Sequence, residues 1–179
     1  FEWSARVPMV FHAPGRFAPR RVCQPVSLVD LLPTIAEIAL NGKSPTYADS
    51  LDGHSLLPLL EGTDTKKTGT VYAEMLGEGA VAPLLMIRRG CYKYIYSKPD
   101  PEQLFDLEND PTELHNLADR QEFQDLRRDF HAEMLQHWDN EALHKQVIDS
   151  QHRRRLVYRA LRRGRHTPWD FQPYQDASQ

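Results

Sequence analysis

The stretch Ser4-Ala5-Arg6-Val7-Pro8-Met9-Val10-Phe11-His12-Ala13-Pro14-Gly15 decides the fold predicted for this chain. Val7 to Phe11 is a short apolar run that Pro14-Gly15 closes, which is typical of a strand buried on both faces of a parallel sheet. Such a strand needs neighbours on both sides, yet the following residues supply only one good helix before the sequence changes character. We therefore predict that the rest of the sheet lies upstream of Phe1 and that the chain is the C-terminal part of a larger α/β protein.

The composition of the chain limits the kinds of protein to which it can belong. The 179 residues include 22 basic and 25 acidic side chains, and the net charge of −3 gives no field that favours nucleic acid. No apolar run approaches the length of a membrane-spanning helix, so we expect no membrane partner. Cys23 and Cys91 are too few for a disulfide framework. Free thiols suit a reducing compartment, and we predict a cytoplasmic location.

Helical patterns follow the predicted strand. Ser27-Leu28-Val29-Asp30 has the form of a capping box, and apolar residues recur at helical spacing from there to about Leu40. Pro33 lies inside this pattern, so either the helix is kinked there or a short first turn ends and a second helix begins. Ser55 is expected to cap a further short helix that Gly62 ends.

Strand patterns appear after residue 66. The runs with strand character are Thr70–Met75, Leu84–Arg88, Cys91–Tyr96 and Gln103–Leu107. The second and third runs form a hairpin with its turn at Arg89-Gly90, and the whole set predicts a small antiparallel sheet. Alternation in the third run places Tyr92, Tyr94 and Tyr96 on one face of this sheet.

Two helices and an aromatic tail complete the chain. A stripe of apolar residues predicts one helix over 121–138, and a sparser pattern predicts another over 141–163 that Gly164 ends. Residues 167–174 are rich in aromatic residues and proline and have no period. Such a tail usually docks in a groove or on a partner.

The fold class predicted from these patterns is α/β, with a small antiparallel subdomain and a helical C-terminal extension. We divide the chain into three parts, which are 1–66 (the last part of the main α/β domain), 67–118 (the antiparallel subdomain) and 119–179 (the helical extension and tail). The third part is expected to serve homo-oligomerisation.

Arginines crowd the end of the second C-terminal helix without an acid to balance them. They are Arg153, Arg154, Arg155, Arg159, Arg162, Arg163 and Arg165. One interpretation is a surface for nucleic acid or anionic lipid. The slightly acidic chain as a whole favours the other interpretation, in which the arginines form ion pairs across a subunit or domain interface.

Two places have the composition of a binding pocket, although motifs alone indicate no catalytic centre and no metal site. Glu74 and Glu78 follow a predicted strand among glycines and small residues. In the tail, rings alternate with carboxylates, and the residues concerned are Trp169, Asp170, Phe171, Tyr174 and Asp176. Aromatic faces and a carboxylate suit a quaternary ammonium group, which attracts π-faces and negative charge. The alternatives are a solvated loop for the first place and a tail anchored by aromatic burial for the second.

Several segments, taken in order, resemble sulfatases of the alkaline-phosphatase superfamily. They are Glu2 with Arg6-Val7-Pro8, Ala13-Pro14-Gly15, Ser27 to Thr34, Asp52 to Leu60, and Leu104 to Pro111. The stretch from Ala73 to Tyr96 and the Trp169-Asp170-Phe171-Gln172-Pro173 tail resemble the choline-sulfatase branch in particular. The resemblance implies the C-terminal part of an alkaline-phosphatase-like sulfatase fold.

The resemblance also implies an activity, which is hydrolysis of choline-O-sulfate to choline and sulfate with a formylglycine nucleophile and a divalent cation, usually calcium. Cys23-Gln24-Pro25-Val26-Ser27 begins like the C-x-P-x-R motif that yields formylglycine, but Ser27 stands where the arginine belongs, and we expect Cys23 to be a buried free thiol. The nucleophile and the metal ligands should therefore precede Phe1, so that this chain alone should be inactive. Substrate-side roles are implied for Glu74, Glu78, Trp169, Asp170, Phe171 and Asp176. The competing hypothesis is a non-catalytic interaction or oligomerisation module that uses the arginine-rich helix.

Overall fold

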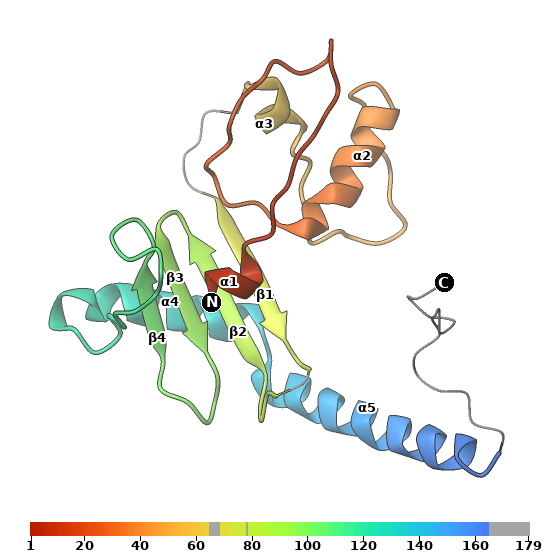
Figure 1. Cartoon of the computed structure of the whole chain (residues 1–179), viewed down its shortest axis with the longest axis vertical. Coiled ribbons are helices and arrows are strands. Elements are labelled where there is room, and N and C mark those ends of the chain that lie inside the picture. Colours follow the sequence, from red (N-terminus) through yellow and green to blue (C-terminus); the bar gives the residue numbers. More distant parts are fainter. Residues whose placement is uncertain (65–68, 78, 165–179) are drawn as a thin grey trace, which may run out of the picture. The chain divides into compact units, whose positions relative to one another are not determined.

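A computed structural model describes residues 1–64, 69–77 and 79–164 of the protein. Its packing divides the chain into two units, residues 1–138 and 139–179. The first unit contains the sheet, and the second is built on one long helix, α5 (Figure 1). Within the described ranges no helix is both long and apolar enough to cross a membrane. The division at residues 66 and 118 stays a prediction.

A four-stranded antiparallel sheet is the centre of the first unit. Its strands are β1 (Thr70–Met75), β2 (Leu84–Arg89), β3 (Tyr92–Tyr96) and β4 (Gln103–Asp106), and they pair in the order β1-β2-β3-β4. Each strand pairs with its neighbour in the chain, which confirms the predicted small sheet. The turn between β2 and β3 contains Gly90 at a φ of 57°, a left-handed conformation that favours glycine.

One face of the sheet packs against α4 (Gln124–His137), which follows a short 3₁₀ turn, η2 (Gln121–Phe123). The Tyr94 ring stacks on Phe130 of α4 with ring centroids 5.8 Å apart. Leu85, Ile87 and Met134 are fully buried in the same core. The predicted alternation of the β3 tyrosines is therefore confirmed, because this face turns its rings toward α4.

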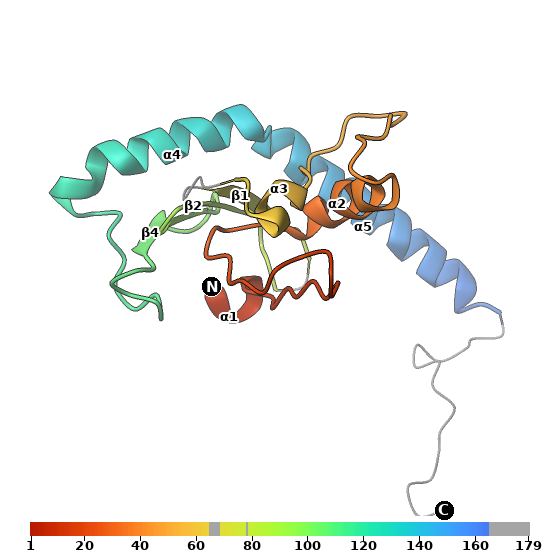
Figure 2. The same ribbon diagram turned by 90° about the horizontal axis from the view of Figure 1, so that it is seen from above.

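The opposite face of the sheet holds a buried charge network and the N-terminal helix α1 (Glu2–Ala5) (Figure 2). Lys93 has no exposed surface, and its Nζ lies 2.7 Å from Glu2 Oε1 and 2.8 Å from Glu113 Oε1. Glu2 Oε2 also accepts a hydrogen bond from Arg88 Nη1 at 2.8 Å. Glu113 adopts a φ of 57°, unusual for a residue with a side chain, and these contacts hold it there.

The predicted strand at Val7–Phe11 is wrong for the structure described. Residues 6–12 have no regular secondary structure, and Val7 and Val10 are 55% and 86% exposed. An extended segment becomes a strand only when a partner satisfies its backbone groups. In the described part of the chain no strand pairs with this segment. The sheet present is the antiparallel one, in a mixed helix and strand fold.

Residues 27–62 contain two short helical segments. The predicted cap at Ser27 is confirmed, whereas the cap predicted at Ser55 is wrong, because Leu56 is the N-cap of the second segment. Ser27 N–H donates to Asp30 Oδ2 at 2.8 Å in a capping box, which opens η1 (Leu28–Asp30) and then α2 (Leu31–Ala39). Pro33 therefore falls in the first turn of α2, where its missing N–H costs no helical hydrogen bond. The short helix α3 (Leu57–Glu61) ends at Gly62, which has a φ of 78°. Cys23 is exposed, so the expectation of a buried thiol is wrong.

The second unit begins with α5 (Asn140–Leu161). Asp139 caps this helix by accepting a hydrogen bond from Ala142 N–H at 3.0 Å. Residues 151–164 are exposed throughout, including large apolar side chains. The helix boundaries agree closely with the predicted range of 141–163.

Candidate functional site

Aromatic rings and carboxylates meet where the edge strand β1 passes the C-terminal end of α4. This aromatic–carboxylate cluster consists of Tyr72, Glu74, Arg89, Glu133, His137 and Trp138. Tyr72 and Glu74 are two apart on β1, so both side chains leave the same face of the sheet. Their cross-strand partners, Ile87 and Leu85, belong to the core under α4, which places the cluster on the α4 side.

Three rings form the apolar part of the cluster. The Tyr72 ring stacks on the His137 imidazole with centroids 4.0 Å apart and planes within 6° of parallel. Trp138 meets both rings edge-on, with centroids 5.8 Å from Tyr72 and 4.4 Å from His137. Such edge-to-face contacts complement the aromatic quadrupoles. These ring contacts join β1 to the C-terminal end of α4.

Two carboxylates form its polar part. Tyr72 Oη donates to Glu133 Oε1 at 2.6 Å, and Arg89 Nη2 donates to both oxygens of Glu133 at 2.6 and 2.5 Å. Burial raises the pKa of Tyr72, and the hydrogen bond to Glu133 and the charge of that carboxylate raise it further. Glu133 is thus committed to its two donors, and Tyr72 stays protonated at neutral pH.

Glu74 differs from Glu133 because it retains free acceptor capacity. Its Oε2 accepts a hydrogen bond from the Trp138 indole Nε1 at 3.1 Å, and the residue is exposed. Among the described residues, Oε1 of Glu74 has no hydrogen-bond partner and no ion pair. An exposed carboxylate oxygen with free acceptor capacity can attract an organic cation.

The structure describes only part of the predicted site. Glu74 lies in the cluster, whereas Glu78, Trp169, Asp170, Phe171 and Asp176 lie outside the described residues. Sequence reasoning missed the rings of Tyr72, His137 and Trp138. The alternation of Tyr72 and Glu74 on one strand was a usable signal, but nothing local pairs Glu74 with a tryptophan 64 positions away.

The described residues, 1–64, 69–77 and 79–164, contain no candidate metal site. These ranges contain no group of three or more histidine, cysteine, aspartate or glutamate side chains placed to hold an ion. Asp106 and Asp110, which stand in an acidic run, instead accept hydrogen bonds within their own loop, from Glu108 N–H and His115 N–H. The acidic run is therefore a turn structure.

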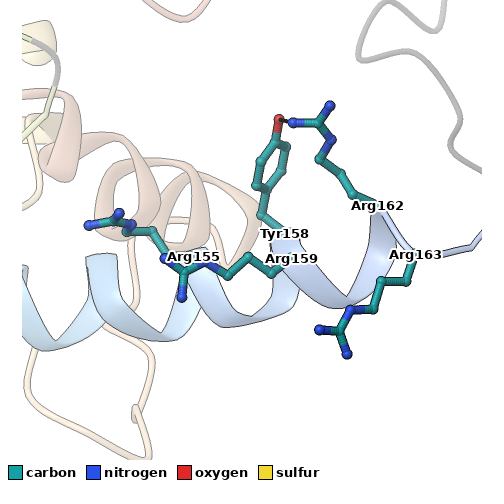
Figure 3. Close-up of a pocket in the computed structure, with 5 residues that line it drawn as sticks. All are labelled: Arg155, Tyr158, Arg159, Arg162 and Arg163. Atoms are coloured by element: carbon teal, nitrogen blue, oxygen red, sulfur yellow. Dashed lines mark hydrogen bonds between the residues drawn. The ribbon is translucent and has the colours of Figure 1, made fainter.

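The second unit presents a basic surface at the end of α5. Arg155, Arg159, Arg162 and Arg163 line a hollow together with Tyr158, and Tyr158 Oη accepts a hydrogen bond from Arg162 Nη1 at 3.2 Å (Figure 3). In the described part of the chain, Arg155, Arg159 and Arg163 have no acidic partner. Like charges four apart on a helix repel one another, so an anionic group nearby would stabilise this end of α5.

Family models cover the chain in two parts. Residues 1–140 match "N-sulphoglucosamine sulphohydrolase, C-terminal", and residues 145–179 match "Choline sulfatase enzyme C terminal". The break between the two matches lies close to the junction of the two packing units.

Curated proteins give a consistent result. The chain is 44% identical over 192 residues to choline-sulfatase of Rhizobium meliloti (strain 1021), covering 100% of this chain and 35% of that protein. It is 33% identical over 136 residues to arylsulfatase K of Danio rerio, covering 72% of this chain and 25% of that protein. The chain thus spans about a third or a quarter of the length of these relatives.

Solved structures support the same assignment of fold. The crystal structure of Ps i-CgsB matches 72% of this chain and 28% of that chain at 31% identity, with a TM-score of 0.57. Its complex with k-i-k-neocarrahexaose matches 67% of this chain and 26% of that chain at 32% identity, with a TM-score of 0.54.

Proposed function

Because the chain belongs to the sulfatase family, whose C-terminal region it matches, we propose that it forms part of an enzyme that hydrolyses choline-O-sulfate. The observation that supports this substrate is the 44% identity to a choline-sulfatase across the whole chain, α5 included. The match of residues 145–179 to the choline-sulfatase C-terminal model supports it further. The alternative of a non-catalytic module receives no support from the relatives.

The chemistry proposed for the enzyme is attack by a formylglycine hydrate on the sulfur atom, with a divalent cation such as calcium binding the sulfate group. The described residues do not fit either group, because they contain no cluster that could hold a metal ion and Ser27 replaces the arginine of C-x-P-x-R. We therefore assign no bond-breaking step to this chain. Its proposed contribution is recognition of the organic part of the substrate.

Glu74 is the residue we propose for that recognition. A trimethylammonium group has no hydrogen-bond donor, so it is attracted by charge and by aromatic surface. Glu74 supplies an exposed carboxylate whose second oxygen is held by Trp138, and Trp138 supplies a ring beside it. The roles of Glu78, Trp169, Asp170, Phe171 and Asp176 remain proposals that rest on the family resemblance.

The experiment is Glu74→Gln in the full-length natural protein. The amide oxygen of glutamine can still accept the Trp138 N–H, so the change removes charge and preserves the hydrogen bond. We expect KM for choline-O-sulfate to rise about tenfold. The kinetics for an aryl sulfate, whose organic part carries no positive charge, should stay unchanged.

Glu122→Gln is the matched control, because Glu122 is exposed on η2 and makes only a long pair with Arg120 at 3.9 Å. It should leave both substrates unaffected. If Glu74→Gln impaired both substrates equally, Glu74 would have a structural role only. If the natural protein failed to hydrolyse choline-O-sulfate at all, the substrate proposal would be wrong.

We also infer that the enzyme is a homo-oligomer. The support is the exposed apolar surface of α5, where Leu156, Val157 and Leu161 are 70%, 56% and 62% exposed. Large apolar side chains that are exposed on one element often mark an interaction surface. Light scattering coupled to size-exclusion chromatography of the full-length natural protein measures the number of subunits directly.

A further inference from the structure

We propose that Trp138 is a positioning residue, which holds the Glu74 carboxylate so that its other oxygen can meet a quaternary ammonium group. This role rests on the recognition role proposed above for Glu74, and it adds a residue that acts through that carboxylate. A hydrogen bond of 3.1 Å from Trp138 Nε1 to Glu74 Oε2 joins the C-terminal end of α4 to the edge strand β1.

Glu74 needs an external contact to fix its carboxylate. The residue is exposed near the end of β1, and its cross-strand partner is Leu85, whose side chain offers no hydrogen bond. A glutamate side chain has several rotatable bonds, and ordering them when a ligand binds opposes binding. A donor that already holds one carboxylate oxygen in the free protein removes part of that cost.

The Trp138 indole is itself fixed by neighbours in the same packing unit. Its ring meets the Tyr72 ring edge-on with centroids 5.8 Å apart, and the His137 imidazole with centroids 4.4 Å apart. Its backbone N–H donates to the carbonyl oxygen of Met134 at 3.0 Å, and Met134 is fully buried under the sheet. The position of the indole N–H therefore follows from the packing of α4 on the sheet.

The Tyr72 ring, against which the indole rests, is anchored at its hydroxyl group. Tyr72 Oη donates to Glu133, and Arg89 binds both oxygens of that carboxylate. Arg89 is opposite Thr70, at the other end of β1 from Glu74, so its charge is spent on Glu133. A cation that approaches the described part of the cluster therefore meets the Glu74 carboxylate, which is held at one oxygen and open at the other.

Trp138→Phe in the full-length natural protein tests the positioning role. Phenylalanine keeps an aromatic ring against Tyr72 and His137 but has no N–H to donate. We expect the dissociation constant of tetramethylammonium, measured by isothermal titration calorimetry, to rise about fivefold, because the freed carboxylate must be ordered on binding. KM for choline-O-sulfate should rise by the same factor.

The turnover number should not change, because the cation is bound equally in the ground state and in the transition state. The kinetics for an aryl sulfate, whose organic part carries no positive charge, should also stay unchanged. Trp3→Phe is the matched control, because Trp3 is 88% exposed on α1, at the opposite face of the sheet. It should leave the dissociation constant of tetramethylammonium as it is.

A double-mutant cycle separates positioning from direct contact with the cation. In a Glu74→Ala background no carboxylate remains to be positioned, so Trp138→Phe should have no further effect on the dissociation constant or on KM. A direct contact between the indole ring and the cation would instead make Trp138→Phe weaken binding by the same factor in both backgrounds.

The outcomes are separable from those of the proposed function. An unchanged tetramethylammonium affinity in Trp138→Phe, or an equal loss in both backgrounds, would overturn the positioning role and leave the proposed substrate intact. If the expected cycle were found in a protein that does not hydrolyse choline-O-sulfate, the proposed substrate would be wrong and the positioning role would stand. A natural protein that binds no tetramethylammonium would overturn the roles of both Glu74 and Trp138, whatever its hydrolytic activity.

Discussion

Replacing Lys93 by methionine removes the centre of the buried charge network. Methionine keeps most of the side-chain length but has no charge, so Glu113, whose side chain has no exposed surface, would remain buried without its cation. Loss of one partner from a buried ion pair costs about 3–5 kcal/mol. Glu2 would lose one of its two cations as well, although Arg88 at 2.8 Å would still pair with it.

Urea unfolding of the chain, followed by circular dichroism, measures this cost. With a denaturant slope of about 2 kcal/mol per molar, we expect the midpoint to fall by about 2 M. Arg128→Ala is the matched control, because the Arg128–Asp125 pair is 72% and 87% exposed and should contribute less than about 0.5 kcal/mol. The reasoning would be refuted if Lys93→Met cost no more than Arg128→Ala.

Three further predictions concern single contacts. Thr34→Val should cost about 1–3 kcal/mol of unfolding free energy, because the fully buried Thr34 Oγ1 accepts from Leu56 N–H at 2.8 Å, and Thr34→Ser should recover most of it in the same urea assay. Gly53→Ala should lower the melting temperature sharply, because the added Cβ would overlap the backbone oxygen of Val29. Gly77→Ala is the control and should be neutral, because a Cβ at Gly77 would have no atom within 4 Å. Burial opposes ionisation of Glu2, but Lys93 and Arg88 outweigh it and hold its pKa below the ordinary 4.5. The stability from Glu2 is therefore present at neutral pH and is lost as pH falls through the lowered pKa, so the natural chain and Glu2→Gln should converge in stability only at pH values below that lowered pKa.

Local patterns predicted the parts of the fold that local forces determine. The Ser27–Asp30 capping box and the alternating tyrosines of β3 each depend on residues within a few positions, and both are confirmed. The strand at Val7–Phe11 failed because strand formation needs a partner, and an apolar run does not say whether one is at hand.

The candidate site was predictable only in part for the same reason. Glu74 stood out because of its neighbours in sequence, but its hydrogen bond to Trp138 depends on how α4 packs across the sheet. The alternation that puts the β3 tyrosines on one face puts Lys93 on the other, yet alternation could not show that Glu2 and Glu113 would neutralise it. Contacts between distant segments follow from packing, which no short pattern contains.

The meander order of the sheet has a consequence for the order of folding. β1 to β4 pair only with neighbours along the chain, so the sheet can assemble by closing short loops in succession. The Glu2 backbone N–H, by contrast, reaches the Glu113 carboxylate across 111 positions. Closing so long a loop is entropically costly, so the N-terminal segment should dock after the sheet has formed. Glu2→Gln should then accelerate unfolding while leaving the refolding rate nearly unchanged. The first residues of the chain would in that case stabilise a sheet that has already folded, without helping it to form.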